Sequence, residues 1–211
     1  MKNRLLTVCA LAFGSLTAYA TPLAPGGSVG PTAINWGGSQ VGFLFNTYTP
    51  PGLTVNYTEE IYVDPGNVYC SNCLDFVFTV NNRLTGAITD VTVGGFAGFS
   101  TSVGYWNTFG AIPESISRSA DGSLIDFAYS ASDTITPGQK SFLVIETNAF
   151  GPDGIGFEDG GTVGFNDPGV AGSFDSLQPL GLAPVPEPSS FVLLGSGLLG
   201  LAAAAKRKLF A

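Results

Sequence analysis

The sequence contains no histidine, and charged residues make up only 11% of its 211 positions. Without histidine, the chain cannot build a Ser-His-Asp or Cys-His catalytic arrangement, and it has no side chain whose ordinary pKa lies near 7. The net charge of −8 argues against a nucleic-acid partner, because nucleic acid requires a basic face. Disorder is also disfavoured, since 45% of the residues are hydrophobic.

The first twenty residues have the pattern of a secretory signal peptide. Lys2 and Arg4 supply a short positive segment, residues 5–16 are apolar, and Ala18 and Ala20 form an A-x-A cleavage pattern. The apolar run is shorter than the ~20 residues that a membrane-spanning helix requires. We therefore expect residues 1–20 to direct the chain to the secretion translocon and to be removed by signal peptidase.

The C-terminal residues have a different design. Residues 189–205 contain no charge, and a basic cluster follows them at Lys206, Arg207 and Lys208. Seventeen helical residues span about 26 Å, which is the short limit for a transmembrane helix. The basic cluster would hold this end in the cytoplasm. Composition alone fits an ordinary single-span anchor.

A short proline-rich motif directly precedes this span, with the residues Val185, Pro186, Glu187 and Pro188. In this order and spacing, the motif, the Gly/Leu/Ala-rich span and the basic cluster resemble the PEP-CTERM protein-sorting signal over residues 185–211. The resemblance implies export from a Gram-negative bacterium, a transient inner-membrane anchor, and recognition of the motif by an exosortase that removes the helix. It also implies delivery to the cell surface or extracellular matrix and a link to exopolysaccharide or biofilm. Because this signal is attached to many unrelated ectodomains, it indicates a destination and not an activity.

The remaining residues, 21–184, predict an all-β ectodomain. Short β-type runs alternate with Gly- and Pro-rich turns at the spacing of a sandwich or barrel, and no window keeps a helical period. We expect an antiparallel β-sandwich of jelly-roll or immunoglobulin-like type. The expected strands are 41–48, 53–63, 74–80, 88–93, 100–106, 114–119, 124–130, 141–147 and, as the last, 161–165.

The ectodomain is more acidic than the whole chain. It contains fifteen acidic and three basic residues, a net charge of −12. Asp153, Glu158 and Asp159 lie in a Gly-rich stretch, residues 151–174, whose loop oxygens are weak candidates for Ca²⁺. The spacing fits neither an EF-hand nor a glycine-rich nonapeptide repeat, so solvated turn carboxylates are the alternative. No other cofactor or metal is expected.

Cys70 and Cys73 are the two cysteines of the mature chain. Outside the cytoplasm, this spacing favours a disulfide. The alternative is a redox-active pair. Such a pair needs its first cysteine at a helix N-terminus, whereas the residues after Cys73 have a strand pattern. Zinc would need further ligands, and the mature chain has no histidine or third cysteine.

Three functions fit these features. The first is a non-enzymatic envelope or matrix protein sorted by the C-terminal signal. The second is a carbohydrate-binding or ice-binding module in which exposed rings stack on the ligand, with Trp36, Tyr105 and Trp106 as candidates. The third is a hydrolase that uses carboxylates alone, as glycosidases do.

Overall fold

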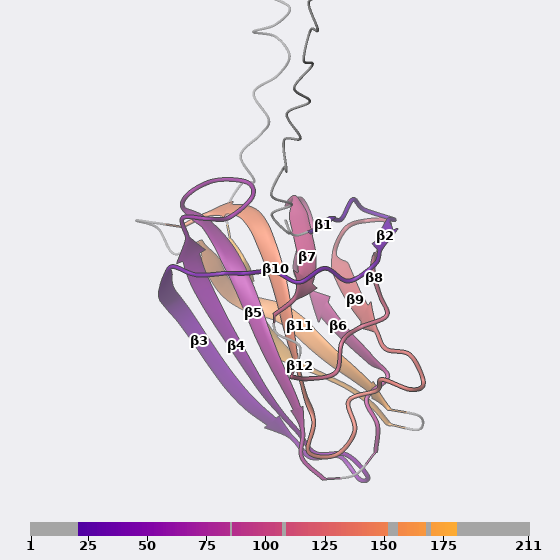
Figure 1. The fold of residues 1–211 in the computed structure, drawn as a ribbon. Helices are drawn as coiled ribbons and strands as arrows, with labels where there is room; N and C mark the ends of the chain where they lie inside the picture. Colours follow the sequence, from indigo (N-terminus) through magenta and orange to yellow (C-terminus); the bar gives the residue numbers. More distant parts are fainter. Residues whose placement is uncertain (1–20, 85, 107–108, 152–155, 168–169, 181–211) are drawn as a thin grey trace, which may run out of the picture.

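The computed structural model describes residues 21–84, 86–106, 109–151, 156–167 and 170–180. The expected signal peptide (1–20) and the expected sorting segment (185–211) lie outside these residues. Within the described part, the chain forms twelve β-strands and no helix, arranged as two six-stranded sheets (Figure 1). This confirms the all-β, two-sheet architecture that the sequence predicts.

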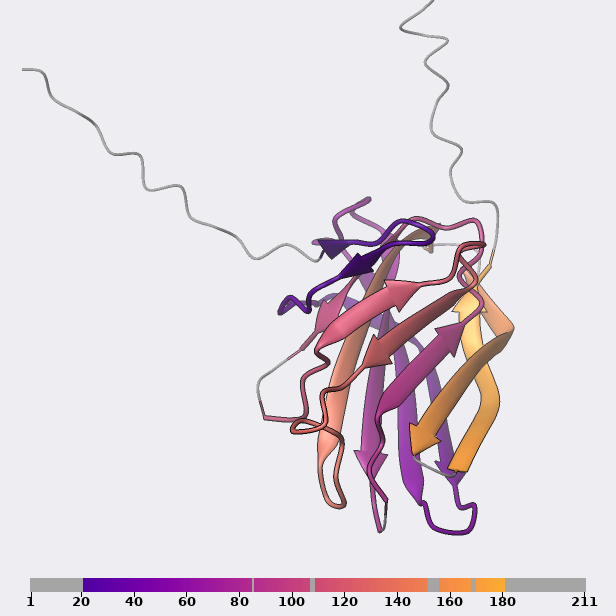
Figure 2. The same ribbon diagram turned by 90° about the vertical axis from the view of Figure 1, so that its right-hand side faces the viewer.

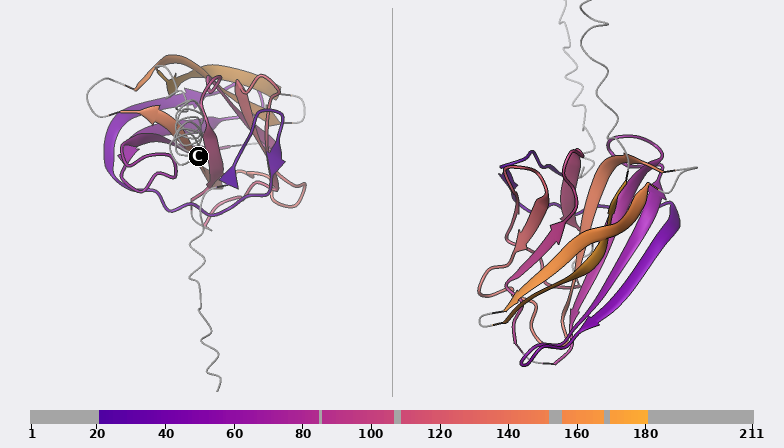
Figure 3. Two further views of the ribbon diagram at one scale, coloured as in Figure 1. Left: turned by 90° about the horizontal axis from the view of Figure 1, so that it is seen from above. Right: turned by 180° about the vertical axis from the view of Figure 1, so that it is seen from behind.

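Both sheets are antiparallel throughout. Sheet A has the strand order β1 (Thr21–Pro22), β7 (Thr101–Tyr105), β10 (Lys140–Phe150), β5 (Cys73–Asn82), β4 (Val55–Asp64) and β3 (Ser39–Tyr48). Sheet B has the order β12 (Val170–Pro179), β11 (Phe157–Asp167), β6 (Asp90–Gly94), β9 (Leu124–Ala128), β8 (Ser115–Arg118) and β2 (Ser28–Val29). Figures 2 and 3 show the two sheets as facing layers.

The core lies between the sheets and is rich in aromatic rings. Tyr57 on β4 meets Phe165 on β11 with ring centroids 6.1 Å apart, and Phe76 on β5 meets Phe96 at 5.4 Å. All four side chains are at most 2% exposed. These rings come from alternate positions of their strands, because successive side chains of a strand point to opposite faces. Burial of this apolar surface is what holds the two layers together.

The predicted strands at the C-terminal end of the ectodomain differ from those in the structure. The segment 161–165 is not the last strand, because it lies within β11, which forms a long hairpin with β12. The Gly-rich stretch that was expected to be loop is therefore largely strand. Glycine and serine give weak strand signals, whereas in the structure backbone pairing and the contact of Phe165 with Phe174 hold this hairpin together.

The N-terminal segment 30–38 crosses the outer face of sheet A, the face turned away from sheet B (Figure 1). We call it the N-terminal strap. Ile34 in the strap is buried against Val77 and Val144, and its amide donates to the Tyr105 carbonyl at 2.8 Å. The amide of Gly37 donates to Asp64 Oδ2 at 3.0 Å. The strap thus covers one part of the outer face and leaves the rest exposed.

Candidate functional site

The outer face of sheet A carries an aromatic cluster beside the strap. The ring of Trp36 lies 4.1 Å from that of Tyr62 and 5.6 Å from that of Trp106, between centroids. Trp106 in turn meets Phe142 edge-on at 5.6 Å and is 37% exposed. The structure therefore brings together two of the three rings proposed for stacking on a ligand.

Tyr105 does not join this cluster. It pairs across the ladder with Leu143, a fully buried core residue, so its side chain lies on the inner side of the sheet. Sequence reasoning missed the partners Tyr62 and Phe142. Their signal was available, because each occupies the outward register of a strand whose alternate positions are apolar.

A row of uncharged side chains crosses the exposed part of the same face. Phe45 lies opposite Thr58, Thr58 opposite Thr79, and Thr79 opposite Phe142. The row ends at Trp106, whose amide donates to the Phe142 carbonyl at 3.0 Å. Neighbouring strands are about 4.8 Å apart, so Phe45 and Phe142, which are three strands apart, lie about 14 Å from each other. Rings flanking hydroxyl groups on a flat face have the composition that stacks on and hydrogen-bonds to sugar rings.

Three buried polar residues form a second row across sheet A, beneath the loop 65–72. Asp75 on β5 lies opposite Glu146 on β10, which lies opposite Ser102 on β7, and all three are at most 3% exposed. Within the described part of the chain, no group donates a hydrogen bond to Asp75 Oδ2, Glu146 Oε2 or Ser102 Oγ. Each of these buried side chains therefore has an oxygen that accepts no hydrogen bond. Ionising a carboxylate in such a site costs free energy.

Burial changes the protonation of this row. It raises the pKa of Asp75 to about 9, with further contributions from a hydrogen bond with Asp64 and the charge of Glu146. Burial and the charge of Asp64 raise the pKa of Glu146 to about 7. Burial and the neighbouring acids thus favour the protonated form of both side chains.

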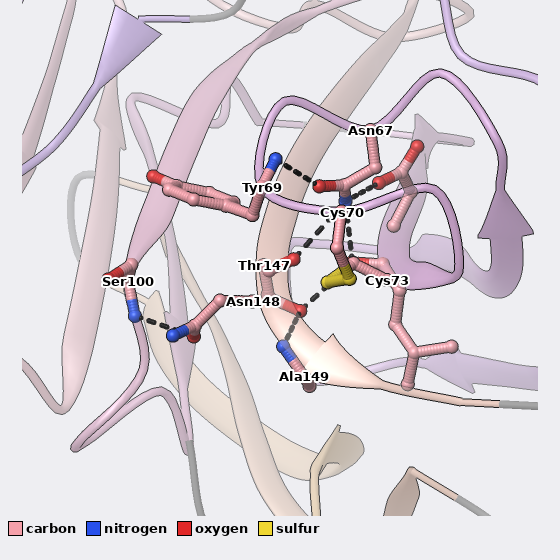
Figure 4. Close-up of a disulfide and its surroundings, with 10 residues drawn as sticks. Asn67, Tyr69, Cys70, Cys73, Ser100, Thr147, Asn148 and Ala149 are labelled. Atoms are coloured by element: carbon pink, nitrogen blue, oxygen red, sulfur yellow. Dashed lines mark hydrogen bonds between the residues drawn. A yellow bond between two sulfur atoms is a disulfide. The ribbon is translucent and has the colours of Figure 1, made fainter. Parts of the chain in front are cut away.

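The loop above this row is fixed by Asn67 and by the cysteine pair (Figure 4). The Asn67 amide donates to Asp75 Oδ1 at 2.6 Å and to the Thr147 carbonyl at 3.2 Å. Cys70 and Cys73 are joined in the structure with their Cα atoms 5.2 Å apart. Cys73 begins strand β5, not a helix, so the pair lacks the setting that stabilises a reactive thiolate.

A separate buried acid, Glu59, ties the two sheets together. Its Oε2 accepts hydrogen bonds from Tyr57 Oη at 2.7 Å, Ser176 Oγ at 2.7 Å and the Leu177 amide at 2.9 Å. Burial raises the pKa of Glu59 to about 7, although these three bonds lower it. Because β4 belongs to sheet A and β12 to sheet B, Glu59 anchors the edge of one sheet to the other.

The structure describes two of the three weak calcium candidates. Glu158 and Asp159 lie on β11, where Glu158 accepts a hydrogen bond from Gln178 at 3.1 Å, and Asp153 lies outside the described residues. Across the described ranges, no group of three or more Asp, Glu, Cys or His side chains is placed to hold a metal ion. Calcium binding stays a prediction without a site that favours it.

The sorting residues and the basic cluster also lie outside the described residues, as does the expected span 189–205. Among the strands and loops that the structure describes, no helix is long and apolar enough to cross a membrane. Residues 184–208 match the family model of the PEP-CTERM protein-sorting motif. The chain carries a PEP-CTERM sorting signal. This signal implies an exported protein with a C-terminal membrane-anchoring sorting signal and an exosortase as its processing partner.

The comparisons give no relative for the ectodomain. No curated protein and no solved structure matches this chain. The sorting match covers the C-terminal segment alone, so the role of the sandwich has to be argued from its own residues.

Proposed function

We propose that this PEP-CTERM protein is a non-enzymatic component of a bacterial cell envelope or extracellular matrix, associated with exopolysaccharide or biofilm. An exosortase recognises Pro186-Glu187-Pro188 after export, removes the C-terminal helix and releases the β-sandwich to the cell surface. The observation that carries the proposal is the sorting motif at residues 184–208.

The burial of Asp75, Glu146 and Glu59 argues against a catalytic role for these three carboxylates. A hydrolase that works with carboxylates alone needs an acid and a second carboxylate facing each other across an open cleft, about 5–9 Å apart. Asp75 and Glu146 are neighbours, but they are 0% and 3% exposed beneath the loop 65–72. Glu59 is fully buried in the core. A substrate reaches none of these three groups.

A second candidate function is polysaccharide binding by the outer face of sheet A. The exposed rings of Phe45 and Trp106, at 51% and 37%, favour it, since they flank the two threonines of the uncharged row. The net charge of −12 on the ectodomain disfavours an anionic chain, so a neutral polysaccharide is the ligand that fits. This activity would also explain retention in a matrix after the anchor is removed.

The sorting proposal is tested with Glu187→Ala, expressed in a host that contains an exosortase. We expect the variant to accumulate in the inner membrane as a chain that retains its C-terminal helix. The matched control is Glu114→Ala, an exposed acid of the ectodomain, which should be processed like the wild type. Processing of Glu187→Ala at the wild-type rate would refute recognition through the motif.

A further inference from the structure

Strand β3 presents a long open edge of sheet A. Among the described residues, nine of the ten positions of β3 pair with β4, and β3 stands at the outer end of the sheet order (Figure 1). The other side of such a strand carries amide and carbonyl groups that a further strand can pair with. In soluble proteins, edges of this kind are normally protected by short length, charge, proline or a bulge.

The other three sheet edges are protected in these ways. Strands β1 and β2 have only two residues each. Strand β12 contains Asp175 and Pro179. Strand β3, Ser39–Tyr48, has neither charge nor proline, and its single bulge is confined to the start, between Gln40 and Gly42. From Phe43 onward, this edge has no charge, proline or bulge that would prevent pairing with another strand.

Three of the exposed side chains of β3 are large and apolar. Phe43 is 60% exposed, Phe45 51% and Val41 47%. Phe43 and Phe45 share one face of the strand, because they are two residues apart. Their exposure leaves a considerable apolar surface in contact with water, which a neighbouring strand with apolar side chains at matching positions would cover.

We propose that β3 pairs antiparallel with β3 of a second copy of this chain, which joins two copies of sheet A into one continuous sheet. A two-fold interface brings the same patch of both copies together, so the patch must complement itself. The sequence Phe43-Leu44-Phe45 is self-complementary in this sense. A two-fold axis at Leu44 places Phe43 opposite Phe45 of the second copy, twice, with all four rings on one face.

Charge supports a second copy as the occupant. Each ectodomain carries a net charge of −12, so two copies repel each other wherever acidic surfaces approach. The ten residues of β3 contain no charge, and the strands that meet in the proposed pair are therefore free of like-charge contacts. This inference is independent of the exosortase step, because β3 is distant in sequence from the sorting motif.

The test compares the exported wild-type protein, as its host releases it, with the double variant Phe43→Lys/Phe45→Lys. Both side chains are more than half exposed, so the melting temperature should hold while the charges block the pairing. Sedimentation velocity should show a wild-type dimer and a monomeric variant. The control Leu84→Lys alters a side chain that is 65% exposed outside the strands, and it should remain dimeric. A monomeric wild type, or a variant that stays dimeric, would overturn the proposal.

Cross-linking tests the pairing itself. Phe43→Cys mixed with Phe45→Cys should give a disulfide-linked dimer under mild oxidation, because the two positions face each other in the proposed register. Either variant alone should cross-link far less, since its own position is diagonal across the axis. Equal cross-linking in all three samples, or none in any, would contradict pairing through β3.

Discussion

Asp75 and Glu146 are direct cross-strand neighbours on the outer face of sheet A, and each has a carboxylate oxygen to which no described group donates a hydrogen bond. Two acids in this position are tolerated while at least one of them is protonated. Ionising both would place two unscreened like charges side by side in a buried site. The stability of the ectodomain therefore depends on the protonation of Asp75 and Glu146.

This pair predicts how stability varies with pH. In the folded state, the pKa of Asp75 is about 9 and that of Glu146 about 7, whereas in the unfolded chain both lie near 4. The folded state thus binds more protons between these values, and the free energy of unfolding should fall as pH rises from about 5 to 9. One such group contributes up to about 1.4 kcal/mol per pH unit.

Urea titrations across this pH range, followed by circular dichroism, measure the effect. Asp75→Asn should flatten the slope and be more stable than the wild type at pH 9, because the amide cannot ionise. The control Asp133→Asn removes an exposed acid and should keep the wild-type slope. A wild-type stability that rises between pH 5 and pH 9 would show that these acids are ionised in the folded state.

Arg118 on β8 should be important for the stability of the N-terminal half. It is 4% exposed, and its guanidinium donates to the carbonyls of Leu23, Phe96, Phe99 and Gly122 at 2.8–3.1 Å. Arg118→Ala removes all of these hydrogen bonds, and each buried acceptor that is left without a donor costs about 1–3 kcal/mol. We expect a loss of about 3 kcal/mol or more in denaturant unfolding. Arg83→Ala, at an exposed arginine, should change the free energy of unfolding little, and equal losses in both would contradict this role.

The Cys70–Cys73 pair predicts an exported protein without free thiols. Thiol titration of the denatured protein should find none before reduction and two afterwards, since Cys9 leaves with the signal peptide. The double variant Cys70→Ser/Cys73→Ser should lose about 2 kcal/mol, because the short loop is no longer constrained in the unfolded chain. Ser71→Ala between them should cost almost nothing. Two reactive thiols in the protein as released would contradict the disulfide.

Polysaccharide binding is tested at Trp106. Pull-down on an insoluble neutral glucan should retain the wild type, and Trp106→Ala should lose most of this retention because the exposed ring is removed. Leu124→Ala is the control, an exposed apolar residue of sheet B. Absence of retention in the wild type, or equal retention of Trp106→Ala, would argue against the aromatic face as a glycan site.

Much of the sandwich could be predicted from alternation alone. Residues 53–63 place Val55, Tyr57 and Ile61 on one face, and in β4 these side chains are fully buried. The same pattern put Glu59 among them, so a buried acid was visible in the sequence. What the pattern could not supply was its partner, since Ser176 lies 117 residues away on another sheet.

The outer face of sheet A was harder to predict. The row from Phe45 to Phe142 exists only once four strands are in register, and single-strand patterns contain no information about register. The same holds for Asp75 and Glu146, which are 71 residues apart in the chain. Strand β12 was missed because its glycine and serine residues resemble loop composition. Local signals define strands, whereas sites that cross a sheet depend on tertiary pairing.

The intact mass of the exported protein, measured from a host that contains an exosortase, tests the central claim most directly. We predict a chain that begins at Thr21 and ends within or beside Pro186-Glu187-Pro188, with residues 189–211 removed. A released protein whose mass includes the sequence through Ala211 would contradict processing by an exosortase.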